Sequence, residues 1–201
     1  MLNNFQKSLQ YVLESEGGFS DNVADSGGAT MKGITLDTYR LFKKNSHLTA
    51  NDLKSISDAD VSTIYLNGFW DRCRCSELPN GIDYCVFDFA INAGYGRSIK
   101  TLQKAVGSDV DGVLGAITIA LVKKHDISDL IRTFSDQKEA FYHYLVGSKP
   151  SQEVFLKGWL NRIATVKDRI DSGSNVPIKK NPVKGRDIKL NKLIDSISKK
   201  K

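Results

Sequence analysis

Residues 16–35 read Glu16-Gly-Gly-Phe-Ser-Asp-Asn-Val-Ala-Asp-Ser-Gly-Gly-Ala-Thr-Met-Lys-Gly-Ile-Thr35. This stretch is rich in turn-forming residues, and its β-capable parts are short, so it predicts a small, irregular β-hairpin or loop. The residues before it have apolar side chains on one face at helical spacing: Leu2, Phe5, Leu9, Val12 and Leu13. We therefore expect a first helix that ends at Gly17-Gly18, with the hairpin packed against it.

The pattern is helical again from Leu36 onward. Thr35 or Asp37 can cap the first of these helices, and Pro150 is expected to break the chain between the last two. The expected helices cover about 36–44, a segment from 51 or 52, a segment from 57–60 toward 70, and 81–93, 97–106, 115–124, 126–145 and 151–170. The predicted fold class is mainly α (α+β), with residues 81–93 as a buried helix.

Composition excludes several classes of protein. The chain has 201 residues, of which 40% are hydrophobic and 26% charged, so it can bury a core and is not disordered throughout. No apolar run approaches the ~20 residues that span a bilayer, and the N-terminus does not read as a secretory signal. Three cysteines are too few for a disulfide framework and indicate a reducing compartment.

The net charge of +6 belongs to the end of the chain. Residues 171–201 hold nine Lys or Arg and three Asp or Glu, so residues 1–170 are neutral. A neutral body with a basic tail is a poor nucleic-acid reader. The tail could instead draw the protein toward an anionic surface.

Two carboxyl groups in the opening stretch could perform acid–base chemistry. Glu16 ends a helix beside apolar Phe19, and both features favour the protonated carboxyl that a general acid needs. Asp25 follows beyond a turn that could fold back toward Glu16. One buried and one polar carboxyl form the arrangement used in glycoside hydrolysis, and the Thr30 hydroxyl could hold the attacking water.

These motifs resemble those of the N-acetylmuramidases of glycoside hydrolase family 108, of the phage and prophage endolysin type. The resemblance rests on ordered segments over about residues 5–170, listed here: Glu16-Gly-Gly-Phe19, Asp25-Ser-Gly-Gly-Ala-Thr30, Gly33-Ile-Thr35, Phe69-Trp-Asp71, Phe87-Asp-Phe-Ala-Ile-Asn-Ala-Gly94, Leu102-Gln103, Val110-Asp-Gly-Val-Leu-Gly115 and Lys157-Gly-Trp-Leu-Asn-Arg162. Phe19 replaces the family's tyrosine, and Ser26 replaces its usual proline.

The resemblance implies a lysozyme-like helical fold and a division of the chain. Residues 1–92 would form the muramidase region, 93–170 a helical peptidoglycan-binding region in the same globule, and 171–201 a basic tail. It implies Glu16 as the catalytic acid. The Glu-x8-Asp-x4-Thr spacing is similar to the active-site pattern of phage lysozymes, with one residue fewer before the threonine, and supports Asp25.

Further residues have a functional and a structural interpretation. Phe69 and Trp70 could stack on a sugar ring, but an aromatic pair at this composition is more often core, so we expect Phe69 in the core and leave Trp70 open. Phe19 is a further candidate for contact with the substrate. Asp88 and Asn92 share one helical face and could line the floor of a cleft or form a structural hydrogen-bonded pair. Asp109-Val-Asp-Gly112 lacks the later ligands of a calcium loop, and neither the cysteines nor the histidines have zinc spacing. We expect no metal and no cofactor.

The leading hypothesis is a monomeric muramidase that cleaves the β-1,4 bond between N-acetylmuramic acid and N-acetylglucosamine of peptidoglycan. The resemblance implies an endolysin that stays in the host cytoplasm until a holin opens the membrane. Three alternatives remain: a lytic transglycosylase, a non-catalytic wall-binding module, and a Cys/His peptidase.

Overall fold

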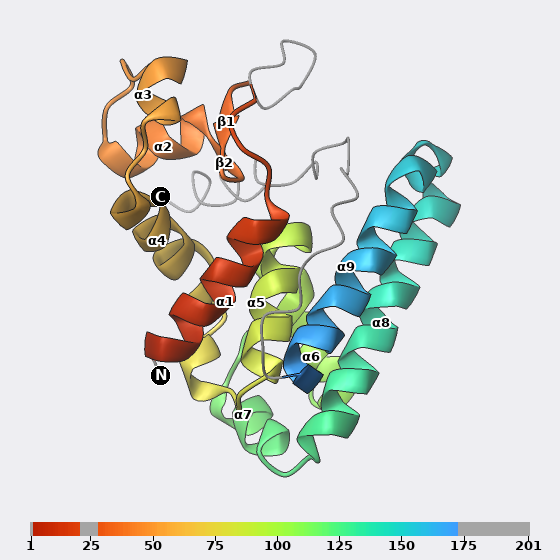
Figure 1. Ribbon diagram of the computed structural model, residues 1–201. Coiled ribbons are helices and arrows are strands. Elements are labelled where there is room, and N and C mark those ends of the chain that lie inside the picture. Colours follow the sequence, from red (N-terminus) through yellow and green to blue (C-terminus); the bar gives the residue numbers. More distant parts are fainter. Residues whose placement is uncertain (1, 21–27, 173–201) are drawn as a thin grey trace. The chain divides into compact units, whose positions relative to one another are not determined.

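The computed structural model describes residues 2–20 and 28–172 (Figure 1). The chain divides into two compact units. The described residues of the first unit are 2–20 and 28–72, and those of the second are 73–172. Helices make up most of both, and the described residues contain one two-stranded antiparallel sheet. The predicted fold class, mainly helical with a small hairpin after the first helix, is confirmed.

The first helix, α1 (Leu2–Ser15), ends where the sequence indicated. Its apolar face is buried through Phe5, Leu9 and Val12. The Glu16 amide still donates to the Val12 carbonyl at 3.0 Å, and the chain then leaves the helix. Gly17 and Gly18 are not among the residues with positive φ, so the helix ends without the glycine cap that we expected.

The hairpin consists of β1 (Thr30–Met31) and β2 (Ile34–Thr35), in a register that pairs Thr30 with Thr35. Ser20 forms a further antiparallel bridge to Thr30, so the chain leaving α1 joins the same small sheet. Lys32 and Gly33 connect the strands with φ of 49° and 76°. Two consecutive positive φ angles are typical of a type I′ turn, whose twist suits a two-residue hairpin.

Three short helices follow the hairpin in the first unit: α2 (Leu36–Lys43), α3 (Ala50–Lys54) and α4 (Asp58–Tyr65). Of the two cap candidates for α2, Thr35 is the one used, and Ser57 caps α4 at the start of the predicted segment. The cap of α3 is Thr49, which forms a capping box with Asp52, so this helix starts earlier than expected. The helical run continues from α4 into a π-helix, η1 (Leu66–Trp70), as the predicted extent toward residue 70 required.

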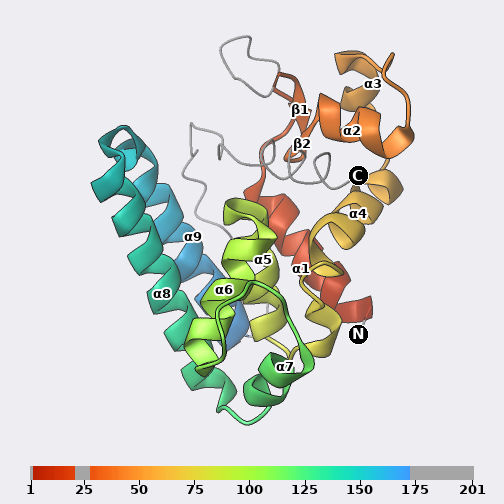
Figure 2. The same ribbon diagram turned by 180° about the vertical axis from the view of Figure 1, so that it is seen from behind.

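The second unit begins with a 3₁₀ turn, η2 (Cys75–Glu77), and then contains α5 (Ile82–Ala93), α6 (Tyr95–Val106), α7 (Ala116–Val122), α8 (Ile127–Ser148), the 3₁₀ turn η3 (Pro150–Gln152) and α9 (Glu153–Ser172). Residues 82–92 of α5 are all buried, which explains why this segment is apolar all round. In Figures 1 and 2, α8 and α9 lie side by side. Pro150 begins the 3₁₀ turn that connects them in the chain, as predicted.

The two compact units meet in the sequence at residues 72 and 73, inside the region assigned to catalysis from the sequence. The boundary at residue 92 was placed between two functional regions and not between two compact units. It stays a prediction. Of the predicted tail, residues 171 and 172 end α9, and residues 173–201 lie outside the described residues.

Candidate active site

Glu16 is half-buried and occupies the first position beyond α1. Its main-chain amide is held by Val12, so the residue is fixed to the last turn of the helix. Phe5 on the buried face of α1 packs against Trp70 of the same unit, so the carboxyl group projects from a helix that is held in place. A general acid needs such support, because it must deliver its proton to one particular atom.

The turn of the hairpin lies directly against the Glu16 carboxyl. A methyl group on the α-carbon of Gly33 would be 3.0 Å from Glu16 Oε2 and 2.6 Å from Tyr65 Oη. Both oxygens therefore lie within 3.0 Å of one point beside the Gly33 main chain. Three elements meet there: the end of α1, the hairpin turn and the last residue of α4.

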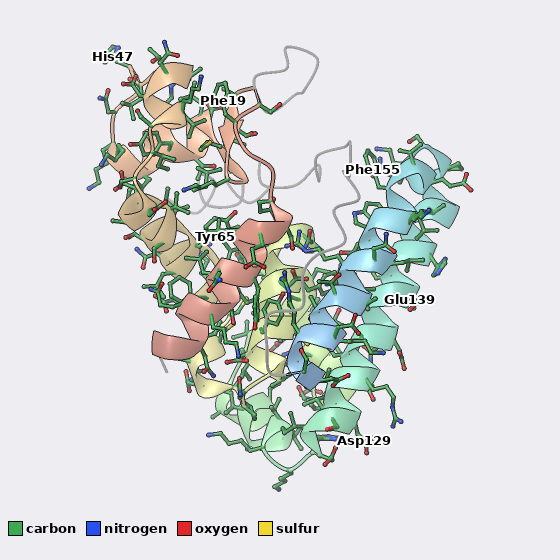
Figure 3. All side chains as sticks on the ribbon, viewed as in Figure 1. Phe19, His47, Tyr65, Asp129, Glu139 and Phe155 are labelled. Carbon is green, nitrogen blue, oxygen red and sulfur yellow. The ribbon has the colours of Figure 1, made fainter. Side chains whose placement is uncertain are left out.

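Tyr65 fixes this junction from the α4 side. Its hydroxyl donates to the Lys32 carbonyl at 2.9 Å, and its side chain is almost completely buried. Figure 3 labels Tyr65 at the end of α4, beside the end of α1 that carries Glu16. The ring packs at 5.8 Å from that of Phe69 in the π-helix. A π-helical turn directly after a site residue is common at functional sites.

Trp70 is part of the core of the first unit. It is 1% exposed, and its ring meets that of Phe5 edge to face at 5.4 Å. This contact joins α1 to the π-helix and so stabilises the two elements that carry Glu16 and Tyr65. Of the two interpretations of Trp70, the structure favours the core residue, because a buried ring offers no face to a sugar.

Phe19 and Thr30 both lie in the chain segments that surround the junction. Phe19 is half-buried, and the ammonium group of Lys54 lies 5.4 Å from its ring centroid, so one face is occupied by a cation–π contact. Thr30 is buried in the hairpin, where its main chain pairs with both Ser20 and Thr35. Asp25 lies outside the described residues, and its proposed role stays a prediction.

Asp88 is the centre of a charged cluster in the second unit. Its carboxyl accepts from Lys138 Nζ at 2.6 Å and from Arg162 Nε at 2.7 Å, so one α5 residue pairs with both α8 and α9. Burial alone would raise the pKa of Asp88, but the opposing charges of Arg162 and Lys138 outweigh it and hold the pKa below its ordinary value. This carboxyl is therefore ionised and joins three helices.

Asn92 does not pair with the Asp88 side chain. Its amide donates to the main-chain carbonyl of Asp88 at 2.7 Å, one turn earlier in α5. Both residues are buried in the second unit, with Asp88 2% exposed at its side chain. These contacts support the structural interpretation of the two residues. A role in lining a cleft stays a prediction.

The described residues also bear on the thiol alternative and on metals. Cys73, Cys75 and Cys85 are buried and form no disulfide, and burial raises the pKa of the Cys85 thiol to about 12. A buried, protonated thiol is a poor nucleophile, which disfavours a peptidase of the Cys/His type. Within residues 2–20 and 28–172 no cluster of His, Cys, Asp or Glu could hold a metal ion, and no helix is long and apolar enough to cross a membrane.

Sequence reasoning missed Tyr65, Lys138 and Arg162 as site or cluster residues. A signal existed for Lys138, because it interrupts the apolar face of α8 between Phe134 and Tyr142, and a charge on a buried face needs a partner. No comparable signal pointed to Tyr65, since a buried tyrosine at a helix end does not indicate where its hydroxyl reaches.

The chain is similar to known proteins over most of its length. A family model described as Glycosyl hydrolase 108 matches residues 9–94, and one described as a predicted peptidoglycan domain matches residues 97–164. Among solved structures, that of SagA from Brucella abortus is similar, with a TM-score of 0.73 and 31% sequence identity. The match covers 90% of this chain and 99% of that one. The search of curated proteins gave no match.

Proposed function

Because the chain belongs to the glycosyl hydrolase 108 family and is therefore a glycosidase that acts on peptidoglycan, we propose that Glu16 protonates the β-1,4 bond between N-acetylmuramic acid and N-acetylglucosamine. The observation that carries the proposal is the position of the Glu16 carboxyl. It stands at the end of α1, against the turn of the hairpin and beside Tyr65, within the region that matches the hydrolase family.

The chemistry divides between two carboxyl groups. Glu16 gives its proton to the glycosidic oxygen, the bond from that oxygen to the anomeric carbon breaks, and positive charge develops on the sugar ring. Asp25, as the second carboxyl, activates the water that adds to the anomeric carbon or stabilises the developing charge. Thr30, buried in the hairpin, is the candidate for holding that water.

The distance between the two carboxyl groups decides the stereochemical course. A separation of about 6.5–9.5 Å leaves room for the water and gives inversion, whereas about 5–5.5 Å favours retention through a covalent intermediate. The anomeric configuration of the first-formed product, followed by NMR on a soluble glycan oligomer, measures which course operates. The rate of product formation by Asp25→Asn in the same NMR assay tests whether Asp25 is the second carboxyl group.

Mass spectrometry of digested sacculi tests the proposal directly. Wild-type protein should release fragments with reducing muramic acid ends, and Glu16→Gln should release far fewer of them. Fragments lighter by one water, with anhydro-muramic ends, would instead identify a lytic transglycosylase. Sacculi that bind the wild-type protein but stay intact would identify a wall-binding module. Cleavage within the stem peptide would identify a peptidase.

The finer biological role is that of a phage or prophage endolysin that reaches the wall after a holin opens the inner membrane. The resemblance to the endolysin type supports this role, and the cysteines, free of disulfides in the described residues, suit a reducing compartment. Cells that express the chain should stay intact until the membrane is permeabilised, and then lyse. Lysis without permeabilisation would contradict holin-dependent release.

A further inference from the structure

The Tyr65 hydroxyl group lies beside Gly33 and has no role in the reaction proposed above. Tyr65 Oη and Glu16 Oε2 would both lie within 3.0 Å of a methyl group on the Gly33 α-carbon, at 2.6 Å and 3.0 Å. Tyr65 itself is 1% exposed. Its hydroxyl therefore lies on the protein side of the junction, where it can act on the position of Glu16 but has little surface to offer a substrate.

The hydrogen bond of Tyr65 reaches across the fold rather than along it. The hydroxyl of the last α4 residue donates to the Lys32 carbonyl in the hairpin turn, at 2.9 Å. Lys32 has a φ of 49°, a left-handed conformation that side-chain-bearing residues adopt at a cost. The bond thus fixes a turn that would otherwise be free to relax, and Gly33 is the next residue in that turn.

The position of Gly33 in turn limits where the Glu16 carboxyl can lie. A methyl group on Gly33 would lie 3.0 Å from Oε2 and 3.4 Å from Cδ of Glu16, so a shift of the turn changes the space open to that carboxyl. We propose that Tyr65 is a positioning residue that holds the Lys32–Gly33 turn and thereby aims the proton donor Glu16. This inference rests on the proposed function of Glu16 as the general acid.

Tyr65→Phe removes the hydroxyl and leaves the ring packed on Phe69. With soluble muropeptide oligomers as substrate, we expect kcat to fall about 10- to 100-fold, because a misplacement near 1 Å costs that much, while KM changes less than about twofold. Tyr39→Phe is the matched control. Tyr39 is also a buried tyrosine of the first unit, and its hydroxyl lies 3.4 Å from Asp60, so its loss should leave kcat unchanged.

A double-mutant cycle separates positioning from a general structural role. If Tyr65 acts through Glu16, Tyr65→Phe should change kcat less than about twofold in a Glu16→Gln background, because the group that it aims is already gone. An equal loss in both backgrounds would overturn the inference. So would wild-type kcat in the Tyr65→Phe single variant.

A rescue variant keeps the test decisive if Tyr65→Phe fails to fold by circular dichroism. Replacing Tyr65 with p-aminophenylalanine restores an N–H donor that can reach the Lys32 carbonyl. Recovery of wild-type kcat by the p-aminophenylalanine variant supports the inference. A tenfold loss of kcat in that variant, when it is folded, overturns it. Full activity of Glu16→Gln would instead refute the proposed function itself, which keeps the two failures distinct.

Discussion

The α-carbon of Gly33 lies against the carboxyl group of Glu16, so closely that a methyl group there would be 3.0 Å from Oε2. Two independent constraints therefore demand glycine at this position. Its φ of 76° disfavours any side chain, and the space beside it is filled by Glu16 and Tyr65. The hairpin turn and the candidate acid are consequently one structural unit.

Gly33→Ala should abolish most of the activity. The added methyl group would lie 2.6 Å from Tyr65 Oη, a distance that real contacts of this kind do not reach, so Tyr65, Glu16 or the turn must move. We expect at least a ~10²-fold loss of kcat, since small displacements of an acid are that costly. Turbidity clearing of sacculi and kinetics on soluble oligomers measure the loss.

Gly107→Ala is the control for backbone strain alone. Gly107, which follows α6, also has a positive φ, 69°, but a methyl group on it would meet nothing within 4 Å. Both variants should lose about 1 kcal/mol or more of unfolding free energy from the unfavourable φ, and only Gly33→Ala should lose activity as well. Equal activity of the two variants would show that contact with Glu16 does not matter.

Glu16→Gln should keep the fold and lower clearing by at least ~10²-fold, because the amide cannot donate a proton to the glycosidic oxygen. Glu14→Gln is the matched control. Glu14 lies two residues earlier on the exposed side of the last turn of α1, where it accepts a hydrogen bond from Gln10. Its substitution should leave clearing at the wild-type rate. Near-wild-type clearing by folded Glu16→Gln would refute the assignment.

The elements were predictable because each has a local cause. The apolar face of α1, the cap Thr35, the helix start within residues 57–60 and the break at Pro150 all act within a few residues, and the structure confirms them. The prediction of a glycine cap after α1 was wrong, because the chain extends directly from Glu16 into the bridge at Ser20. Local propensity here gave way to pairing with the hairpin.

The surroundings of the candidate site were less predictable because they depend on contacts between distant residues. Glu16 could be inferred from its position at a helix end, but the hydroxyl of Tyr65 reaches the turn from another helix. Asp88 was seen as a buried polar residue, whereas its partners Lys138 and Arg162 come from two later helices. Spacing along one element cannot show which residues a second element will bring to it.

Asp88→Asn should destabilise the second unit strongly at neutral pH. It removes the carboxylate that pairs with buried Lys138 and with half-buried Arg162, and breaking a buried ion pair costs about 3–5 kcal/mol. Asp129→Asn is the control on α8, because the Asp129–Arg132 pair is well exposed and worth less than about 1 kcal/mol. Urea unfolding of both variants measures the difference. Equal stabilities would show that the cluster contributes nothing.

The destabilisation by Asp88→Asn should depend on pH with a definite sign. The pKa of Asp88 lies below its ordinary value of 3.8 in the folded protein, so the unfolded chain takes up its proton first as the pH falls. The contribution of the Asp88 carboxylate to the free energy of unfolding is then complete above about pH 5. It is lost as the pH falls through the folded-state pKa. The stability gap between wild type and variant should stay constant from about pH 5 to 7 and shrink below about pH 4. A gap that widens in acid would contradict this assignment.

Removing residues 173–201 should slow the lysis of whole sacculi and leave the cleavage of soluble oligomers intact. The deletion takes away nine Lys or Arg and two Asp or Glu, and with them the charge that attracts the protein to an anionic wall. The effect should be largest in dilute salt, because the Debye length shrinks from about 30 Å at 0.01 M to about 8 Å at 0.15 M. Clearing assays on both substrates at these two salt concentrations measure it.

A full-length variant with the tail lysines changed to glutamine is the control for charge, and it should behave like the deletion. Equal rates for wild type and deletion on sacculi at 0.01 M salt would contradict a steering role. Loss of the folded state on truncation, seen by circular dichroism, would contradict the boundary at the tail, since Leu190, Leu193 and Ile197 would then be needed by the body of the protein. A tail that acts through charge alone predicts that only the substrate with a large anionic surface, the intact sacculus, responds to its removal.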